Sequence, residues 1–357
     1  MKKNKLIRFI IPVFIIILVI FGICFCINNL DAVSKDSHEV TLKIEPGTST
    51  QEILKILKEK NLIKNENFMK LYIKINEVDG LKAGTYILNK NMTPKQIFKA
   101  LQKGSNLEND DIIITFPEGK NMRQIAKIIE KNTSYSYDDV FNLLSDKEYI
   151  NSLISTYSFL DESILNENIY YPLEGYLSPN TYNFKKDSTI KDIFAKMLDQ
   201  TDTIVKEFNN SFSNSNFTVQ QIFTLASIIE GEGVTLDDRK NIAGVFINRL
   251  NAGMSLGSDV TTYYAVKVDM GDRDLYKSEI NSDNPYNTRS AANAGKLPIG
   301  PICNPSKESI EAAVNYTPND YYYFVADKNM KVYFTKTDIE HVNKINELKS
   351  QDLWFEY

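Results

Sequence analysis

The first regular pattern of hydrophobic and polar positions lies between residues 40 and 57. Val40 to Ile44 alternate apolar and polar side chains, which predicts a strand, and Pro46-Gly47 predicts the turn that follows it. Ser49 and Glu52 have the spacing of a capping box, and they open a helix whose apolar positions begin at Ile53. A strand, a turn and a helix are therefore expected in quick succession.

Similar patterns continue to about residue 105. A second helix is predicted near residues 67–74, and a strand is predicted near residues 84–88. A further helix has Thr93 as its cap and Pro94 at its first position, and Gly104 follows its end. Together these elements predict a compact domain over residues 40–105.

The strand, turn and helix then recur. Residues 113–116 predict a strand, Pro117-Glu118-Gly119 predicts a turn, and a helix with Ile125 on its apolar face follows. Gly47 corresponds to Gly119 at the same offset that relates Ile53 to Ile125, which makes this an internal repeat of a small β-α element. The repeat predicts a shared packing module, and a pair of binding surfaces is the alternative interpretation.

An uncharged apolar segment precedes this domain. As a helix, residues 9–30 would extend about 33 Å at about 1.5 Å per residue, which is enough to cross a bilayer core. Basic residues precede the segment and acidic residues follow it, so the positive-inside rule places residues 1–8 in the cytoplasm. We therefore expect a transmembrane anchor over residues 9–30, a tether over residues 31–39 and a single-pass cell-membrane protein whose bulk is extracytoplasmic. A cleaved signal peptide is the competing interpretation, but a small-x-small cleavage site is lacking.

Composition narrows the chemistry that the chain can perform. Of its 357 residues, 43% are hydrophobic and 24% are charged, which suits a folded protein of two or three domains. Cys24 and Cys26 lie in the apolar segment, so Cys303 is the remaining thiol and an intramolecular disulfide framework is excluded. With His38 and His341 as its two histidines, the chain lacks the ligands for a multi-histidine metal site. We therefore expect chemistry that rests on carboxylates.

The net charge argues against nucleic acid as a partner. The formal charge is -5, and it is more negative for the part of the chain that follows the basic residues before the apolar segment. An acidic surface is not attracted to a phosphate backbone. An anionic polymer would have to be held by hydrogen bonds and stacking instead.

A strongly apolar helix is predicted over residues 219–230. Ala226 and Phe223 precede Glu230 at helical spacings, so its carboxylate is expected to project from an apolar face near the end of the helix. Burial raises the pKa of a carboxyl group, which suits a general acid. Glu232 has a comparable position, so periodicity leaves the choice between the two glutamates open.

Polar and aromatic loops surround this helix in the sequence. Residues 170–182 combine tyrosines with proline and glycine, and they predict a loop that either lines a binding groove or packs between domains. A second helix over about residues 237–250, loops between residues 258 and 305, strands over residues 321–326 and 332–335 and a last helix complete the chain. His341 lies in that last helix and is interpreted as structural.

The chain carries an ordered series of short motifs. They are Leu81–Tyr86, Glu174–Tyr182, Leu225–Glu232, Val245–Leu250, Ser258-Asp259-x-Thr261, Tyr286-Asn287-Thr288, Leu297–Pro305, Tyr323–Ala326 and Glu340-His341. Taken together, the motifs resemble those of the YceG-like, MltG-type endolytic murein transglycosylases. The resemblance extends from the apolar segment to near the C-terminus. One departure is Val332, which stands where the family often has a histidine.

The resemblance implies a fold and a function. The implied fold is α+β, with a single N-terminal transmembrane helix, a small LysM-like β-α domain over residues 40–105 and a larger α+β catalytic region over residues 106–357, whose core spans about 216–345. The implied function is a lytic transglycosylase that cleaves the β-1,4 bond between N-acetylmuramic acid and N-acetylglucosamine and leaves 1,6-anhydromuramyl ends. Its implied role is in cell-wall synthesis and in control of glycan strand length.

The resemblance also implies site residues and partners. It assigns catalysis to Glu230 and requires neither metal nor cofactor. The expected substrate contacts are Glu232, Asn248, Asp259, Thr261, Tyr264, Tyr286, Asn287, Thr288 and Asn304. The expected partners are peptidoglycan glycan strands, the membrane through the N-terminal helix and cell-wall synthases, and nucleic acid is excluded.

Two other functions stay open at this point. A muramidase that uses water would need a second carboxylate, for which Glu232 and Asp259 are the candidates. A non-enzymatic scaffold would bind the cell wall through the LysM-like domain and would not depend on Glu230 for cleavage. The chemistry of the product ends distinguishes the two enzymes.

Overall fold

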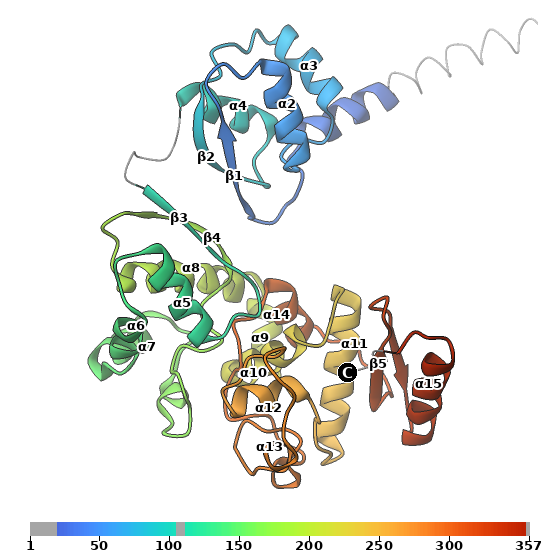
Figure 1. The fold of residues 1–357 in the computed structure, drawn as a ribbon. Coiled ribbons are helices and arrows are strands. Elements are labelled where there is room, and N and C mark those ends of the chain that lie inside the picture. The colour runs from blue at the N-terminus through green and yellow to red at the C-terminus, as the bar shows by residue number, and fades with distance from the viewer. Residues whose placement is uncertain (1–19, 105–110, 355–357) are drawn as a thin grey trace, which may run out of the picture. The chain divides into compact units, whose positions relative to one another are not determined.

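The computed structural model of the chain describes residues 20–104 and 111–354 and divides into two compact units (Figure 1). Unit 1 comprises the chain up to Ile113 together with Thr181–Lys186, and unit 2 comprises Ile114–Asn180 and the chain from Asp187 onward. Among the described residues the strands form two-stranded sheets with the orders β1-β2, β3-β4 and β5-β6, and helices make up most of the remainder. The predicted α+β class is confirmed.

In unit 1 an antiparallel strand pair packs with helices. β1 (Glu39–Ile44) pairs with β2 (Gly84–Asn89) in a register that places Glu39 opposite Asn89 and Ile44 opposite Gly84. The helices are α2 (Thr50–Glu59), α3 (Glu66–Ile75) and α4 (Pro94–Lys103). These are the elements that the sequence predicts over residues 40–105.

The capping and the core of unit 1 follow from its sequence pattern. Ser49 and Glu52 form the predicted capping box of α2, and Thr93 forms a second one with Gln96 at the start of α4. The apolar side chains of the strands and of one face of each helix form a buried core. Its members include Leu42, Ile44, Leu54, Leu57, Met69, Tyr86, Leu88, Ile97 and Leu101.

The predicted transmembrane helix over residues 9–30 is contradicted. Residues 20–30 are helical, and at about 1.5 Å per residue they extend about 16 Å, about half of a bilayer core. Phe25 in this helix packs edge to face on Phe68 of α3, with ring centroids 5.7 Å apart. No helix within residues 20–104 and 111–354 is long and apolar enough to span a membrane, and residues 9–19 lie outside the described residues. The single-pass cell-membrane localisation that we expected is therefore not supported.

The repeated β-α element lies at the start of the next part of the chain. β3 (Asp111–Phe116) leads into the turn at residues 117–119 and then into α5 (Met122–Asn132). Asn121 and Gln124 form a capping box at the position that Ser49 and Glu52 occupy before α2. The internal repeat is confirmed as a repeat of structure.

Several helices and one strand in the following segment were not predicted. The elements are α6 (Tyr137–Leu144), α7 (Lys147–Thr156), the 3-10 helix η1 (Glu162–Leu165), β4 (Asn180–Lys185), α8 (Ile190–Glu207) and α9 (Asn209–Ser213). The many polar residues of this region had favoured loops. Capping boxes at Ser136/Asp139 and Thr189/Asp192 are the local signals that mark α6 and α8.

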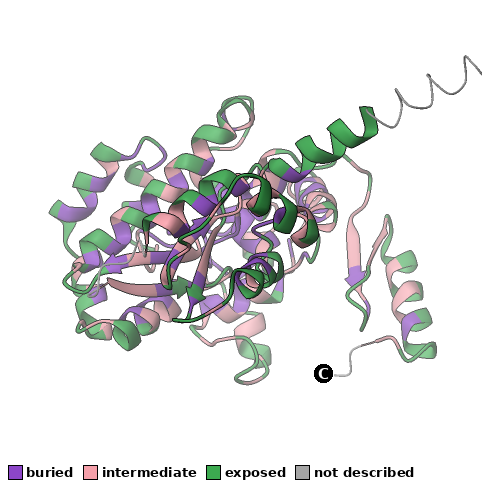
Figure 2. Cartoon of the chain, turned by 90° about the horizontal axis from the view of Figure 1, so that it is seen from above, coloured by how far each residue is buried: buried purple, intermediate pink, exposed green. Residues whose placement is uncertain are grey.

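Helix α10 (Val219–Glu230) lies at the centre of unit 2. α11 (Leu236–Asn251) and α14 (Lys307–Val314) pack against it (Figure 1). Every residue of α10 from Ile222 to Ile229 is buried, and Figure 2 shows how buried residues run through the helices of the interior. The chain between α11 and α14 forms α12 (Asp259–Ala265), α13 (Lys277–Ile280), the 3-10 helix η2 (Ala291–Asn293) and loops.

A C-terminal hairpin and helix complete unit 2. β5 (Tyr323–Ala326) pairs with β6 (Val332–Thr335), and α15 (Asp338–Ser350) packs on the pair. The Asn248 side chain on α11 donates to the backbone oxygens of Asn319 at 3.0 Å and Tyr321 at 2.8 Å, which fixes the start of the hairpin. The ring of His341 stacks on Tyr323 at 5.3 Å between centroids, which agrees with a structural role.

Candidate functional site

Helix α10 carries Glu230 at its C-terminal end. Thr218 and Gln221 form a capping box at the start of the helix, and its buried residues hold it in the interior of unit 2. The Glu230 side chain is 7% exposed. Its carboxylate therefore lies at the border between the interior and the surface.

Polar and charged groups hold the Glu230 carboxylate. The backbone N–H of Ser306 donates to Oε2 at 2.9 Å, and the Ser306 hydroxyl donates to the same oxygen at 2.6 Å. Arg239 Nη2 lies 3.4 Å from Oε1. The apolar surroundings expected from periodicity apply to the helix but not to these oxygens, because the starts of α11 and α14 bring polar side chains to the end of α10.

Arg239 is fixed by several acceptors at once. Its side chain is 10% exposed, and its Nη1 donates to Ser306 Oγ and to Glu308 Oε2, each at 3.1 Å. Its Nε donates to the backbone oxygen of Gly233 at 3.2 Å. Because a guanidinium presents its donors in a rigid plane, these bonds fix both its position and its orientation beside Glu230.

A cleft of about 250 Å³ opens beside Glu230. Its lining includes Ser227 and Glu230 of α10, Tyr263 and Tyr264 of α12, and Asp269. Aromatic rings stack on the apolar faces of sugars, while carboxylates and hydroxyls pair with sugar hydroxyls. The lining is therefore suited to a carbohydrate.

The turn after β3 lies against the Glu230 side chain. A Cβ atom at Gly119 would be 3.6 Å from Cγ of Glu230. The Gly119 N–H donates to the backbone oxygen of Asn304 at 3.0 Å, and the Asn304 side chain donates to the backbone oxygen of Lys120 at 2.9 Å. Residues 304–306 therefore hold both the turn and, through Ser306, the carboxylate.

This turn brings a second carboxylate, Glu118, close to Glu230. Glu118 as a whole residue is exposed, although the surrounding protein partly shields its carboxyl group from solvent. Partial burial raises its pKa, the negative charge of Glu230 raises it further, and Arg239 acts in the opposite direction. From the sequence, Glu118 was expected in the turn and not in the site.

Two of the predicted contacts, Tyr264 and Asn304, bind a buried carboxyl group. Glu174 is 1% exposed and accepts hydrogen bonds from the Tyr264 hydroxyl at 2.9 Å and the Asn304 side chain at 3.2 Å. It also accepts from the Met122 N–H at 2.9 Å. Burial raises the pKa of Glu174 to about 7, although these hydrogen bonds oppose the rise. The loop that contains Glu174 is thus packed into the protein, and Tyr264 is the predicted contact that also lines the cleft.

Glu232 and Asp259 belong to a different cluster. Ser258 Oγ donates to Glu232 Oε1 at 2.6 Å, and Asp259 forms an ion pair with Arg289. Burial raises the pKa of Glu232 to about 7, and the charge of Asp259 contributes to the rise. Glu230 and Glu232, which periodicity could not separate, therefore have different surroundings.

The remaining predicted contacts are bonded within the protein. The hydroxyls of Thr261 and Thr288 lie 2.8 Å apart, and both side chains are buried. Asn287 donates to the backbone oxygen of Ser282 at 2.8 Å, and the Tyr286 hydroxyl accepts from the Tyr170 N–H at 3.2 Å. With Asn248, described above, these residues hold the loops and the hairpin in place. A direct contact with substrate stays a prediction for each of them.

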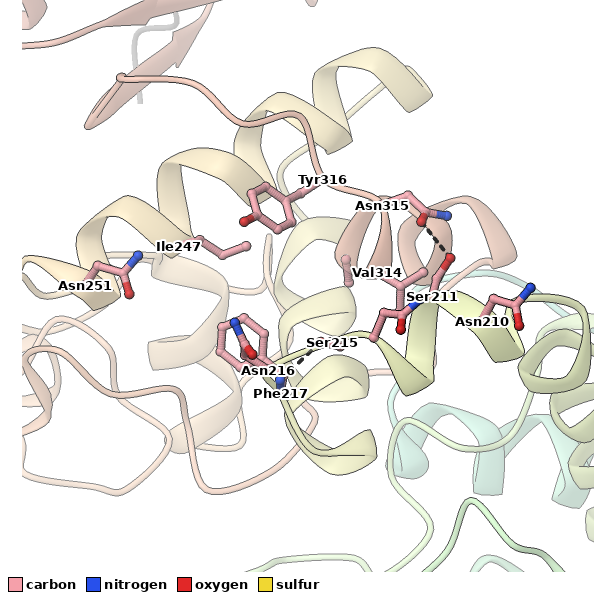
Figure 3. Close-up of a pocket in the computed structure, with 12 residues that line it drawn as sticks. Asn210, Ser211, Ser215, Asn216, Phe217, Ile247, Asn251, Val314, Asn315 and Tyr316 are labelled. Carbon is pink, nitrogen blue, oxygen red and sulfur yellow. Dashed lines mark hydrogen bonds between the residues drawn. The ribbon is translucent and has the colours of Figure 1, made fainter.

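A second hollow, of about 410 Å³, lies at the C-terminal end of α14. Figure 3 shows its amide and hydroxyl side chains, among them Ser211, which donates to Asn315 Oδ1 at 2.7 Å, and the ring of Tyr316. Its lining, which belongs entirely to the described residues, includes no carboxylate. For acid and base chemistry, the cleft beside Glu230 is therefore the better candidate of the two.

Two residues at this centre were not identified from the sequence. Arg239 lies nine positions after Glu230, at the start of the next helix. Ser306 is the N-cap of α14 and lies 76 positions away from Glu230. In the sequence, Arg239 and Ser306 can be recognised only as residues at the start of a helix. That position does not reveal that the starts of α11 and α14 meet the end of α10.

Across residues 20–104 and 111–354, no group of three or more His, Cys, Asp or Glu side chains is arranged to hold a metal ion.

Comparisons with known proteins place this geometry in a family. The profile of the YceG-like family matches residues 42–347. A protein of Bacillus subtilis (strain 168), named endolytic murein transglycosylase, is 39% identical over 321 residues, which cover 89% of this chain and 87% of that protein. A protein of the same name from Streptococcus pneumoniae serotype 2 (strain D39 / NCTC 7466) is 33% identical over 343 residues, which cover 92% of this chain and 62% of that protein.

The fold matches a solved structure as well. The crystal structure of a yceG-like protein from Listeria monocytogenes aligns with a TM-score of 0.61 and 35% sequence identity, covering 87% of this chain and 100% of that chain. The profile match covers most of the chain, and the Bacillus subtilis protein aligns over most of its own length. The chain therefore belongs to the YceG-like family.

Proposed function

We propose that the chain is an endolytic murein transglycosylase, a lytic enzyme that cuts the glycan strands of peptidoglycan, and that Glu230 is its acid and base. The relatives that carry this name support the activity, since the alignment to the Bacillus subtilis protein covers 87% of that protein. The observation that carries the assignment to Glu230 is its position. It is a nearly buried carboxylate that lines a cleft with Tyr263 and Tyr264 and is held by Arg239 and Ser306.

In the proposed reaction a single carboxyl group, that of Glu230, first donates a proton and later accepts one. Protonated Glu230 gives its proton to the glycosidic oxygen between N-acetylmuramic acid and N-acetylglucosamine, and the bond from that oxygen to C1 of the muramyl sugar breaks. The muramyl C6 oxygen then bonds to C1, and its proton passes to the Glu230 carboxylate. The products are a 1,6-anhydromuramyl end and a free N-acetylglucosamine hydroxyl, and Glu230 is again protonated. Water is not consumed.

The contacts of Glu230 favour one of its two oxygens for this proton. Oε2 accepts two short hydrogen bonds from Ser306, at 2.6 and 2.9 Å. Oε1 has the longer contact with Arg239, at 3.4 Å. Because Oε1 has the weaker bond, we assign the transferable proton to Oε1 and the anchoring of the side chain to Oε2.

We propose separate tasks for the two parts of the chain. The domain over residues 40–105 is assigned to LysM-like glycan binding, and residues 106–357 are assigned to catalysis, with their core at about 216–345. The compact core of unit 1, which lies entirely between residues 42 and 101, supports the first boundary. Deletion of residues 40–105 is expected to weaken binding to purified cell-wall sacculi. Cell-wall synthases are the protein partners that this activity suggests.

The test is the chemistry of the product ends. Purified protein is incubated with glycan strands, and mass spectrometry counts anhydromuramyl and reducing ends. Glu230→Gln is nearly isosteric but cannot transfer a proton, so it is expected to lower cleavage by about 10² to 10⁴-fold. Glu148→Gln, at an exposed glutamate of α7, is the matched control and should cleave as the unmodified protein does.

Three results would refute this proposal. Near-normal cleavage by the Glu230→Gln protein would exclude Glu230 as the acid and base, and no cleavage by the unmodified protein would favour a non-enzymatic scaffold. Reducing muramyl ends would instead indicate a muramidase that uses water, with a second carboxylate to activate it.

A further inference from the structure

The turn that contains Glu118 is fixed by two backbone hydrogen bonds to Asn304. The Gly119 N–H donates to Asn304 O at 3.0 Å, and the Asn304 N–H donates back to Lys120 O at 3.0 Å. Asn304 is itself 1% exposed, with its side chain bonded to Lys120 and Glu174. The backbone beside Glu118 is therefore held rigidly, with Gly119 against the stem of Glu230.

The charge of Arg239 acts on both Glu118 and Glu230. The charged groups that act on Glu118 are Glu230, Arg239 and Glu308. Arg239 pairs with Glu230 Oε1 at 3.4 Å and with Glu308 Oε2 at 3.1 Å. Arg239 therefore pairs with two carboxylates and acts electrostatically on a third, Glu118. The Glu230 side chain is 7% exposed and the Glu308 side chain is 60% exposed.

The candidates that the sequence suggested for a second carboxylate have other neighbours. The charged groups that act on Glu232 are Asp259, Arg289 and Arg249. Asp259 is paired with Arg289. A carboxylate that acts together with Glu230 is therefore more readily supplied by the turn after β3 than by the residues after α10.

The internal repeat shows that the turn does not need a carboxylate at the position directly before its glycine. The turn after β1 contains Gly47 with φ +86°, and the turn after β3 contains Gly119 with φ +71°. Both turns precede a capped helix. The offset that relates Gly47 to Gly119 places Pro46 at the position of Glu118 and Glu45 at the position of Pro117. The two turns thus carry the proline and the glutamate in opposite order, and a glutamate directly before the glycine occurs in the copy that contacts Glu230.

We propose that Glu118, in its ionised form, is the second carboxylate of the catalytic centre and contacts the muramyl sugar at the bond that is cut. This proposal rests on the proposed function. Positive charge develops at C1 and the ring oxygen as the bond to the leaving oxygen breaks, and a fixed carboxylate stabilises that charge. Both protons pass through Glu230 as described above, and Glu118 neither gains nor loses one.

The activity should depend on pH because Glu118 acts in its ionised form. Glu118 must be ionised, so activity falls as the pH drops through its pKa, which lies above the ordinary value of 4.5. The acid side of the pH profile therefore belongs to Glu118.

The test compares three variants of the full chain in the assay for anhydromuramyl ends. Glu118→Gln is expected to lower kcat by about 10²-fold with little change in KM, and to remove the acid side of the pH profile. Glu118→Asp keeps the charge and should recover part of the loss. Glu308→Gln removes the other exposed carboxylate beside Arg239 and should cost less than about tenfold.

The measurements on these variants either support or overturn the role proposed for Glu118. Glu118 is exposed, so the melting temperature of the Glu118→Gln protein should match that of the unmodified protein. A kcat within about threefold of normal, an unchanged acid limb, or an equal loss in Glu308→Gln would overturn the role of Glu118. Failure of the proposed function is distinguishable, since it would appear as activity in the Glu230→Gln protein or as reducing ends from the unmodified protein.

Discussion

The buried carboxyl group of Glu174 should make the stability of unit 2 depend on pH. Glu174 is 1% exposed and its pKa is raised to about 7 from an ordinary value of 4.5, with burial as the largest cause. Between these two pH values the folded protein keeps the proton and the unfolded chain releases it. Stability is therefore complete below pH 4.5 and is lost as the pH rises through about 7, after which it no longer changes.

The magnitude follows from the two pKa values. Each unit of difference corresponds to about 1.4 kcal/mol, so the full effect is about 3 kcal/mol, of which about 2.5 kcal/mol is expected between pH 5 and pH 8. Glu174→Gln removes the titration. It keeps an acceptor for the Met122 N–H, and its amide can donate to the Tyr264 hydroxyl in place of the bond seen now.

The assay is urea unfolding of the unmodified protein and the Glu174→Gln variant at both pH values. Other groups titrate in this range, but they contribute equally to both proteins, so the difference between the two free energies of unfolding isolates Glu174. We expect that difference to change by about 2 to 3 kcal/mol in favour of the variant as the pH rises from 5 to 8. A difference that stays constant would show that the Glu174 carboxyl group is not held protonated by burial, and the reasoning would fail.

Three further substitutions test other parts of the structure. Ser306→Ala removes the 2.6 Å hydrogen bond to Glu230 and the side-chain cap of α14, and should lower cleavage about tenfold and the free energy of unfolding by about 1 kcal/mol; a normal cleavage rate would show that the bond does not matter. Gly175→Ala places a Cβ 2.3 Å from Pro301 Cβ at a residue with φ +90°, and should cost more than about 2 kcal/mol, seen as a lower melting temperature in circular dichroism. Leu57→Ala, at a fully buried position in unit 1, should cost about 3 kcal/mol in denaturant unfolding, and a loss below about 1 kcal/mol would contradict its place in the core.

Local signals predicted the elements whose ends are marked by capping residues. The capping box at Ser49, the cap at Thr93 and the periodicity before Glu230 predicted helices that the structure contains. The same kind of signal precedes α8, at Thr189, but the polar residues around it led to a loop interpretation. Capping residues were thus better guides than average polarity, because a cap reports a backbone geometry directly.

The apolar segment at the N-terminus shows the limit of hydropathy. Its length and lack of charge predicted a membrane span, yet in the part that the structure describes, residues 20–30, Phe25 packs on Phe68. The surroundings of Glu230 show the same limit at the site. Periodicity reports the neighbours on one helix, but Arg239 and Ser306 come from the starts of two others, and only the tertiary fold brings them together.

The long sequence separations within the centre have a consequence for how the chain folds. Asn304 bonds Lys120 across 184 positions, and Ser306 bonds Glu230 across 76. Contacts between distant residues form late, because the entropy of closing long loops must be overcome first. A chain that has been synthesised only as far as α12 contains Glu230 but not the Ser306 that holds it. The proposed lytic centre is therefore completed only after Ser306 has been synthesised, and a chain that stops before Ser306 should remain inactive.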